Sequence, residues 1–505
     1  MLFGTDGIRG IICDSPNSDE DSITDLLERR SISPRFMRLV GEALSRFTQP
    51  NSCVIIGWDD RPRNYELAKS LTIGLKLGNC KVIHGGLCAT PGLHNAMLET
   101  RSVFGCMITA SHNPVSESGI KIFDENGFKT NVNIEQDISE LIIQIASEDR
   151  EVDATDLIEL EKPNSLFEAD KHHRDMISKR YLEFSETFSE ILPQKILLDC
   201  SKGAPSAWLA EFLCDIGLEA VELSSGSEAL NKNCGAGELS PTDSWSWEDT
   251  RHSEHIMIKS LEKTEPGKII AAALDGDGDR CLLIESTDKG CRVIDGDEMA
   301  DHILRGAKGD WTLAASIESD LALSTSLSRL DANVEFIQTA VGDRWLSDAL
   351  KNSTSNKIGV EDSGHIVLSA PNPNGGRCLV GDGAASLLAT LCAMAVSEKP
   401  DKFTRGFKKR VSIKDTKREL WDGKNSLAED VEEIIKSSLG DLQRKKIVGE
   451  SNLLLLEGKG VSLGIRNSGT QAKTNVSLRV RANVNPEPPL QAMDEVIKFL
   501  NKHLV

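Results

Sequence analysis

The sequence predicts an α/β protein with three related α/β domains in series and a smaller α+β domain at the C-terminal end. Three segments repeat one order of features: an apolar run typical of a buried strand, a polar loop, an amphipathic stretch with helical period, and a second apolar run. The segments begin near residues 52, 194 and 311, and each has the length of a βαβ unit. They are too far apart in sequence to stack as a solenoid, so we interpret them as separate domains.

Each repeated segment predicts its elements in the same order. The expected strands and helices are 53–57, 66–78 and 81–86 in the first segment, 195–199, 207–217 and 219–225 in the second, and 311–317, 321–332 and 333–342 in the third. After about residue 400 the pattern changes to a helix over 428–442 and short alternating strands at 461–465 and 475–480. Ligands of such sheets bind beyond the carboxyl ends of the strands, and we therefore look for function in the loops that follow them.

Polar stretches mark the expected domain boundaries. The predicted domains are 1–160, 161–299, 300–400 and 401–505. Residues 145–162 are expected to form a linker or surface helix, and 396–406 the junction to the last domain. Two further polar segments, 14–33 and 240–254, have little periodicity, and we predict that they are surface loops.

Composition narrows the functional classes. The chain has 505 residues, 39% of them apolar, and a net charge of -20, which repels nucleic acid and anionic membranes but leaves a local site for a small phosphorylated ligand. The longest uncharged apolar run, 383–397, is too short to span a bilayer and predicts a buried helix. No secretory signal is expected at the N-terminus, and the twelve cysteines, which form no C-x-x-C pair, are typical of reduced core residues. We expect a soluble cytoplasmic protein.

The first candidate site is the stretch ITASHNP at 108–114, which follows an apolar run that predicts a strand. A serine hydroxyl such as that of Ser111 is a poor nucleophile unless a base, a metal or a charged neighbour activates it. A capped strand-to-loop turn would explain the same residues. Lys121 adds a candidate proton-transfer group, although a lysine on a strand edge is usually solvated.

The second candidate site is the loop DGDGDR between two apolar runs. Asp275, Asp277 and Asp279 alternate with glycines, so their oxygens can converge on a hard divalent cation. An EF-hand loop is the rival interpretation, but it fits poorly because its position 6 would be Arg280 and its position 12 Ser286. A bare charged hairpin tip is also disfavoured, since three close carboxylates repel one another without an ion.

Two more polar loops lie between expected strands. The stretch EDSGH at 361–365 offers acceptors and donors for sugar hydroxyls and a histidine that can transfer protons near neutral pH. The stretch RNSGT at 466–470 offers a guanidinium, two hydroxyls and a glycine, which together can hold a phosphate. Taken singly, each is also compatible with a simple hairpin turn.

The set of motifs in this order resembles the α-D-phosphohexomutase family, whose members move a phosphoryl group between C1 and C6 of a hexose. The resemblance rests on FGTDGIRG, ITASHNP with GIK, LDGDGDR, GVEDSGH and RNSGT, and it covers almost the whole chain. It implies a phosphoserine enzyme that forms a hexose bisphosphate, binds one Mg²⁺ and acts on small sugar phosphates. A sugar-phosphate sensor and a metal-dependent phosphatase are the other classes considered. A sensor would be expected to lack the serine or the aspartates, and a phosphatase needs no grip on both ends of the sugar.

The resemblance also implies a role for each motif residue. By position, Ser111 matches the phosphoryl carrier, and Asp275, Asp277 and Asp279 match metal ligands together with a phosphoserine oxygen. Arg280 would offset charge, Lys121 would transfer protons, and Arg9 and His365 lie at matching positions nearby. The remaining matches are sugar-hydroxyl contacts at Glu361 and Ser363 and the phosphate-binding loop at Arg466, Ser468, Gly469 and Thr470.

The substrate is predicted from finer likenesses. FGTDGIRG, LDGDGDR, VGDRW at 341–345 and NKNCGA at 231–236 most resemble the branch of the family that converts glucosamine 6-phosphate to glucosamine 1-phosphate. Glucose and mannose phosphates remain the alternative, because the sugar-loop contacts are common to all three. The chain departs from the family pattern at Ser118, Val360, Gln471 and Ala472. The sequence makes no prediction of oligomeric state.

Overall fold

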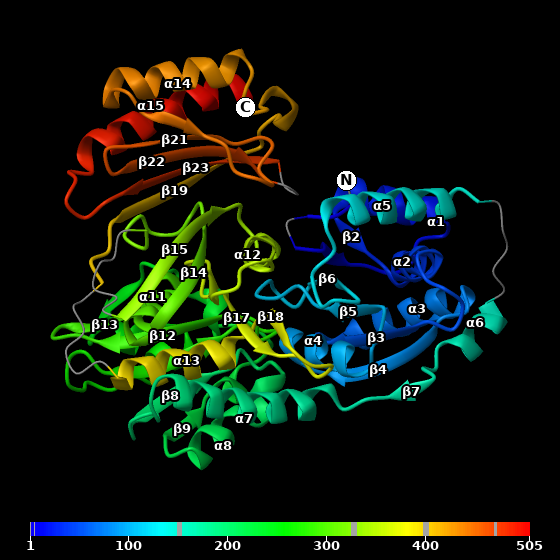
Figure 1. Ribbon diagram of the computed structural model, residues 1–505. Helices are drawn as coiled ribbons and strands as arrows, with labels where there is room; N and C mark the ends of the chain where they lie inside the picture. The colour runs from blue at the N-terminus through cyan, green and yellow to red at the C-terminus, as the bar shows by residue number, and fades with distance from the viewer. Residues whose placement is uncertain (1, 5, 149–153, 325–330, 397–402, 469–471) are drawn as a thin grey trace.

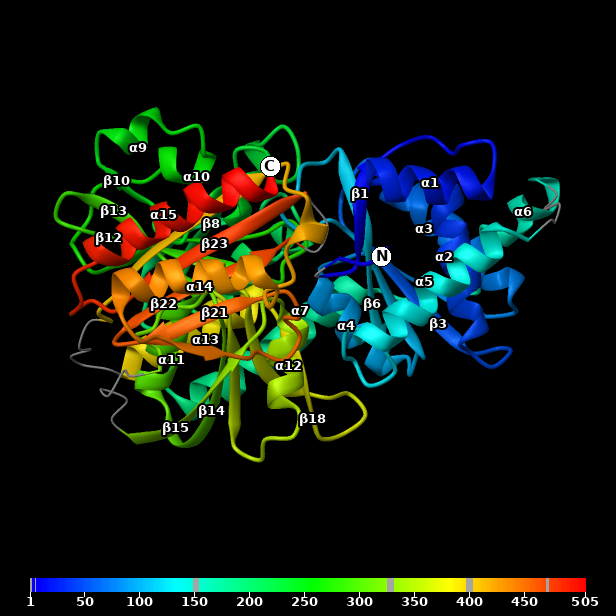
Figure 2. The same ribbon diagram turned by 90° about the horizontal axis from the view of Figure 1, so that it is seen from above.

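The computed structural model describes residues 2–4, 6–148, 154–324, 331–396, 403–468 and 472–505. In these residues the strands form four separate sheets, each with its own helices (Figure 1). The mixed α/β class is therefore confirmed, and the multi-domain arrangement agrees with it. Figure 2 shows the first sheet and its helices on one side, and the fourth over the third. None of the described helices is both long and apolar enough to cross a membrane.

The first sheet has the order β2-β1-β6-β5-β3-β4-β7. Its strands are β1 (Ile8–Ile12), β2 (Ser31–Ile32), β3 (Cys53–Trp58), β4 (Lys81–Leu87), β5 (Phe104–Ile108), β6 (Glu117–Asp124) and β7 (Ser165–Leu166). Its helices are α1 (Asp19–Arg29), α2 (Pro34–Arg46), α3 (Asn64–Leu77), α4 (Thr90–Glu99), α5 (Val132–Ala146) and α6 (Ala154–Leu160). Every residue of β5 is buried, as expected for a central strand covered on both faces.

The second and third sheets follow. The second, β10-β13-β12-β11-β8-β9, contains β8 (Lys195–Asp199), β9 (Glu219–Glu222), β10 (Ser244–Ser246), β11 (Ile269–Leu274), β12 (Cys281–Ser286) and β13 (Gly290–Ile294), with α7 (Ala169–Thr187), α8 (Leu209–Asp215), α9 (Asp249–His252) and α10 (Ile256–Lys259). The third, β15-β14-β16-β17-β18, contains β14 (Lys308–Ser316), β15 (Asp331–Thr339), β16 (Asn356–Val360), β17 (Ile366–Pro371) and β18 (Arg377–Gly381), with α11 (Gly296–Gly306), α12 (Asp343–Leu350) and α13 (Gly383–Val396). One continuous apolar core joins these two sheets.

The fourth sheet is wholly antiparallel, with the order β19-β23-β22-β21-β20. Its elements are β19 (Phe407–Lys414), β20 (Gln443–Lys445), β21 (Leu454–Gly458), β22 (Val461–Asn467), β23 (Lys473–Val480), α14 (Ser426–Leu439) and α15 (Glu487–Leu504). Both helices pack on one face of the sheet and enclose a separate core (Figure 1). The predicted α+β pattern of this part of the chain is confirmed.

The first three sheets share one topology. In each, a central strand (β3, β8 or β14) pairs in parallel with two neighbours, and an antiparallel hairpin strand (β6, β12 or β17) extends the sheet from one of these neighbours. The loop that enters the hairpin strand follows β5, β11 and β16, respectively. These three equivalent loops are ITASHNP, DGDGDR and EDSGH, so the repeat itself gives the three motifs the same place in each sheet.

Three sequence predictions need correction. The segment 14–33, expected to be a loop, contains α1, because Ser18 caps the helix, three acidic residues fill its first turn and Ile23 and Leu26 are buried. The segment 240–254 contains α9 and also β10, which pairs with β13. The helix expected over 321–332 is wrong for the described residues of that range, because 321–324 form a turn and Asp331 begins a strand. Residues 325–330 lie outside the described part.

Candidate active site

Ser111 lies in a strained loop directly after β5. Its side chain is buried, and its backbone has φ 50°, a left-handed conformation that is costly for a residue other than glycine. The Ser111 N–H donates to Thr109 Oγ1 over 2.8 Å, and Ser111 Oγ accepts from Arg9 Nη2 over 3.1 Å. The structure thus brings Arg9 and Ser111 together. Strain of this kind is typical of functional sites.

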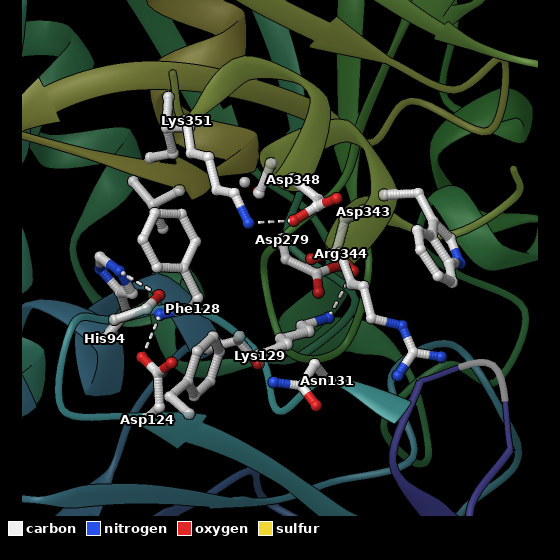
Figure 3. Close-up of a pocket in the computed structure, with 18 of the residues that line it drawn as sticks. His94, Asp124, Phe128, Lys129, Asn131, Asp279, Asp343, Arg344, Asp348 and Lys351 are labelled. Carbon is white, nitrogen blue, oxygen red and sulfur yellow. Dashed lines mark hydrogen bonds and ion pairs between the residues drawn. The ribbon is translucent and has the colours of Figure 1, made fainter. Parts of the chain in front are cut away.

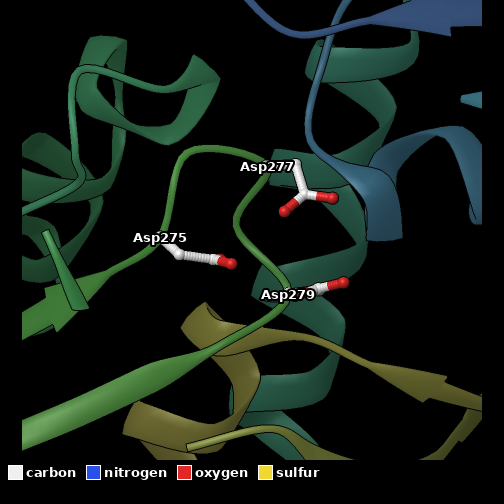
Figure 4. Close-up of side chains that lie close together, drawn as sticks. All are labelled: Asp275, Asp277 and Asp279. Atoms are coloured by element: carbon white, nitrogen blue, oxygen red, sulfur yellow. The ribbon is translucent and has the colours of Figure 1, made fainter. Parts of the chain in front are cut away.

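The three aspartates converge on one point in the loop between β11 and β12 (Figure 4). One oxygen from each of Asp275, Asp277 and Asp279 lies within 4.8 Å of the others, and all three residues are buried. Each also keeps a buried oxygen that accepts no hydrogen bond from the described residues. Burial and the neighbouring carboxylates raise the pKa of Asp275 well above its ordinary value. Three hard oxygen donors with spare acceptor capacity fit a divalent cation.

Lys121 contacts the same carboxylates from the first sheet. Its Nζ lies 2.7 Å from Asp277 Oδ2 and 2.6 Å from Asp279 Oδ2, and the side chain is only 1% exposed. Burial disfavours the charge, but Asp277, Asp279 and Asp6 outweigh it and raise the pKa of Lys121 well above its ordinary value. The solvated lysine considered for a strand edge is therefore excluded, because β6 is an interior strand.

Arg280 and His365 join the second and third sheets beside the aspartates. An isolated β-bridge pairs the two residues, and Arg280 Nε lies 3.8 Å from Asp275 Oδ2. His365 Nδ1 lies 3.5 Å from Asp279 Oδ1, and its Nε2 lies 3.3 Å from Asp343 Oδ2. Burial opposes the charged form of His365, but the two aspartates outweigh it and raise its pKa to about 10.

A chain of charges behind His365 was not predicted. Asp343 Oδ1 lies 2.7 Å from Lys129 Nζ, which lies 2.6 Å from Asp6 Oδ1, and Asp6 Oδ2 lies 2.9 Å from Arg9 Nη2. Asp6 and Asp343 stand inside the quoted motifs FGTDGIRG and VGDRW, which were the available signals, whereas Lys129 lies in no motif. The chain links the first and third sheets across the site.

The charged side chains of Asp343, Lys129 and Asp6 lie between two cavities. A cavity of about 310 Å³ lies between the segment after β6 and helix α12, with Lys129, Asp279 and Asp343 in its wall (Figure 3). Most of the polar groups labelled there are already paired, for example Lys129 with Asp343 and Arg344 with Glu135.

The cavity on the opposite side is lined by five of the predicted site residues. It has a volume of about 430 Å³ and is lined by residues of all four sheets' domains, among them Arg9, Arg280, Glu361, His365 and Ser468. A neighbouring cavity of about 680 Å³ shares the wall formed by His112, Arg280 and Glu361 and extends to Ser363 and Arg410. The Arg280 guanidinium and burial lower the pKa of His112 to about 3, so this histidine is neutral and supports the loop without carrying charge.

The sugar-loop residues face these cavities. Glu361 is buried, and its Oε1 accepts the Gly342 N–H over 2.8 Å, while Ser363 is half-buried in the wall of the larger cavity. Ser118, where the family pattern has asparagine, is buried on β6 and donates its hydroxyl to Asn64 Oδ1 over 2.6 Å. This departure is therefore a structural contact beneath the Ser111 loop.

The fourth domain contributes Arg466 at the end of β22. Its Nη2 lies 3.2 Å from Glu318 Oε1 and its Nη1 3.7 Å from Glu450 Oε1. Ser468 donates its backbone N–H to Lys473 O over 2.9 Å and lies in the wall of the 430 Å³ cavity. The other predicted members of this loop, Gly469 and Thr470, and the departure Gln471 lie outside the described residues.

Comparison with known proteins agrees with this geometry. Residues 1–149 match the model of phosphoglucomutase/phosphomannomutase alpha/beta/alpha domain I, and residues 295–407 match that of domain III. Phosphoglucosamine mutase of Bacillus pumilus is 30% identical over 74% of this chain and 75% of its own length. The enzyme of that name from Actinobacillus pleuropneumoniae is 27% identical over 98% of both chains.

A solved structure extends the likeness to the whole fold. Aspergillus fumigatus N-acetylphosphoglucosamine mutase, in complex with GlcNAc-6P and magnesium, superposes with a TM-score of 0.60 at 12% identity and covers 99% of this chain and 96% of its own.

Proposed function

The chain belongs to the α-D-phosphohexomutase family and is an intramolecular phosphotransferase that acts as a hexose phosphate mutase, and we propose that it interconverts glucosamine 6-phosphate and glucosamine 1-phosphate. Two relatives with the name phosphoglucosamine mutase, one of them similar over nearly the full length, support this substrate. The twelve free thiols support a reducing compartment, which we propose is the cytoplasm.

The proposed reaction uses Ser111 as the phosphoryl carrier. The phosphoryl group passes from Ser111 Oγ to the free hydroxyl of the sugar phosphate: the bond from phosphorus to Ser111 Oγ breaks, a bond to the sugar oxygen forms, and the proton that the sugar hydroxyl loses is balanced by the proton that Ser111 Oγ gains. A hexose bisphosphate results. After the bisphosphate turns over in the cavity, its other phosphate returns to Ser111 and the isomer is released. A Mg²⁺ ion held by Asp275, Asp277, Asp279 and a phosphoserine oxygen would offset the charge of the transferred group.

The other predicted residues support this chemistry. We propose that Lys121, which three carboxylates keep protonated, donates a proton to a leaving oxygen. Arg9 adds positive charge beside Ser111, and Arg280 adds it beside Asp275. His365, on the far side of Asp279, orients that carboxylate and adds to the positive charge. Glu361 and Ser363 would bind sugar hydroxyls, and Arg466 with the 468–470 loop would hold the phosphate that does not react. A distant anchor of this kind lets the bisphosphate bind in both orientations.

The observation that carries the proposal is that Lys121 of the first sheet meets the aspartates of the second at one buried point. Asp6 Oδ2 lies 3.3 Å from Lys121 Nζ and 2.9 Å from Arg9 Nη2, and the same Nη2 donates to Ser111 Oγ. Intact-protein mass spectrometry should find a phosphate-sized addition on Ser111. Ser111→Ala should lose this addition and several orders of magnitude of turnover, while Ser116→Ala, an exposed serine of the same loop, should keep both.

The substrate is tested separately. We expect the highest kcat/KM for glucosamine 6-phosphate when glucosamine, glucose and mannose phosphates are compared side by side. A preference for either neutral sugar would overturn the substrate and leave the mutase reaction standing. Near-normal activity of Ser111→Ala would overturn the mechanism.

A further inference from the structure

The backbone of the Ser111 loop is held by two side chains that bind the same pair of carbonyl oxygens. Arg61 Nη2 donates to Ser111 O over 2.8 Å and to Asn113 O over 2.9 Å. Asn231 Nδ2 donates to the same Ser111 O over 2.8 Å and to the same Asn113 O over 3.1 Å. Both side chains are buried, so these hydrogen bonds are shielded from water.

The two donors come from different domains. Arg61 follows β3 in the first sheet, and its Nε lies 3.1 Å from the buried carboxylate of Asp59, which also accepts from Thr109 beneath Ser111. Asn231 belongs to the segment between β9 and β11 of the second domain. Its Oδ1 accepts the Ser201 hydroxyl over 2.6 Å, which fixes the orientation of the amide and turns its N–H groups toward the Ser111 loop.

Asn231 also touches the loop of the three aspartates. A Cβ atom at Gly276 would lie only 2.8 Å from Asn231 Nδ2, so the amide packs directly against the backbone between Asp275 and Asp277. The position requires a backbone φ of 59°, which asparagine adopts more readily than most residues. One side chain therefore lies between the serine loop and the aspartate loop and contacts both.

We propose that Asn231 is a positioning residue for phosphoryl transfer: from the second domain, and together with Arg61, it sets the Ser111 loop against the aspartate loop. The role rests on the proposed function of Ser111. Reacting atoms must be held to within a few tenths of an ångström, and a displacement of about 1 Å can cost about 100-fold in rate. Binding of the sugar phosphate by Glu361, Ser363 and Arg466 does not involve Asn231.

The test compares two glycine variants with the same backbone freedom. Asn231→Gly removes the amide without forbidding the left-handed backbone. Asn233→Gly is the matched control, because Asn233 has φ 55° and an exposed side chain two residues away. With whichever of the three hexose 6-phosphates is turned over fastest, Asn231→Gly should lower kcat about 10- to 100-fold relative to the control, with KM within about threefold.

A second variant separates the hydrogen bonds from the volume of the side chain. Asn231→Asp keeps the shape and an acceptor for Ser201 but removes the donors to the two carbonyl oxygens, and it should lower kcat at least as far. Equal kcat in Asn231→Gly and Asn233→Gly, a change confined to KM, or failure of both Asn231 variants to fold would overturn the inference. Failure of the proposed function is distinguishable, because it would appear as an active Ser111→Ala protein or as the absence of phosphate on Ser111.

Discussion

Replacing Arg466 with alanine should weaken substrate binding and leave turnover nearly unchanged. Arg466 is the charged residue of the predicted phosphate loop at 466–470, and its side chain is 15% exposed. Glu318 and Glu450 hold the guanidinium at 3.2 and 3.7 Å, and Glu318 is also bound by Arg410 at 2.8 Å. The guanidinium is thus fixed before a phosphate arrives, which lowers the entropy lost when it binds.

The size of the effect follows from these contacts. A hydrogen bond to a charged group contributes about 1.5 to 3 kcal/mol, which corresponds to a rise in KM of about 10- to 150-fold. Arg466→Ala also leaves Glu318 and Glu450 facing the site without this guanidinium. Each of these carboxylates would then repel the phosphate of the substrate. Two like charges roughly 8 Å apart repel by about 0.5 kcal/mol in water and by about 2 kcal/mol in the partly buried setting of a protein surface. The double variant Glu318→Gln/Arg466→Ala should therefore bind substrate more tightly than Arg466→Ala.

The assay is steady-state kinetics on the single and double variants, with Arg466→Lys and Arg444→Ala beside them. Lysine keeps the charge but cannot form two parallel hydrogen bonds, and should give an intermediate KM. Arg444 lies on the edge strand β20 and pairs with Glu432 of α14. Arg444→Ala therefore removes one positive charge, as Arg466→Ala does, but at a position away from the site. A large fall in kcat at constant KM would refute the reasoning, as would a KM of Arg466→Ala equal to that of Arg444→Ala.

Three further outcomes are expected. Exhaustive chelation should abolish activity and Mg²⁺ should restore it, and Asp277→Asn should need far more Mg²⁺; activity that survives chelation would contradict the metal site. Ser118→Ala, measured by denaturant unfolding, should lose about 1 to 3 kcal/mol because it leaves Asn64 Oδ1 buried without its donor, whereas Ser116→Ala should be neutral. Burial lowers the pKa of His94 from 6.5 to about 4, so the unfolded chain binds the proton first and stability should fall as pH drops from 6.5 toward 4, less steeply in His94→Gln; equal slopes would count against it.

Local sequence was sufficient for the elements that carry the site. The apolar runs that became β5, β11 and β16 are each followed by a short polar loop. An apolar run predicts a buried strand and a polar loop predicts a sheet end, and neither prediction needs information from elsewhere in the chain. A different repeat, of strand, polar loop, helix and strand beginning with the runs that became β3, β8 and β14, predicted three related domains. The polar segment 14–33 was misjudged because most residues of α1 are polar, which is typical of a loop, although Ile23 and Leu26 are three residues apart and both buried.

The assembled fold decided which residues meet at the site. Lys121 reads as an exposed strand lysine until β1 pairs with β6 and encloses it, and its partners Asp277 and Asp279 lie more than 150 residues away in the chain. The chain of Asp343, Lys129 and Asp6 and the amide of Asn231 likewise depend on contacts between domains. Strand and loop signals arise from neighbouring residues and are legible in sequence. Burial of a charge and the choice of its partner arise only when the domains pack, because both depend on distance in space and on the exclusion of water.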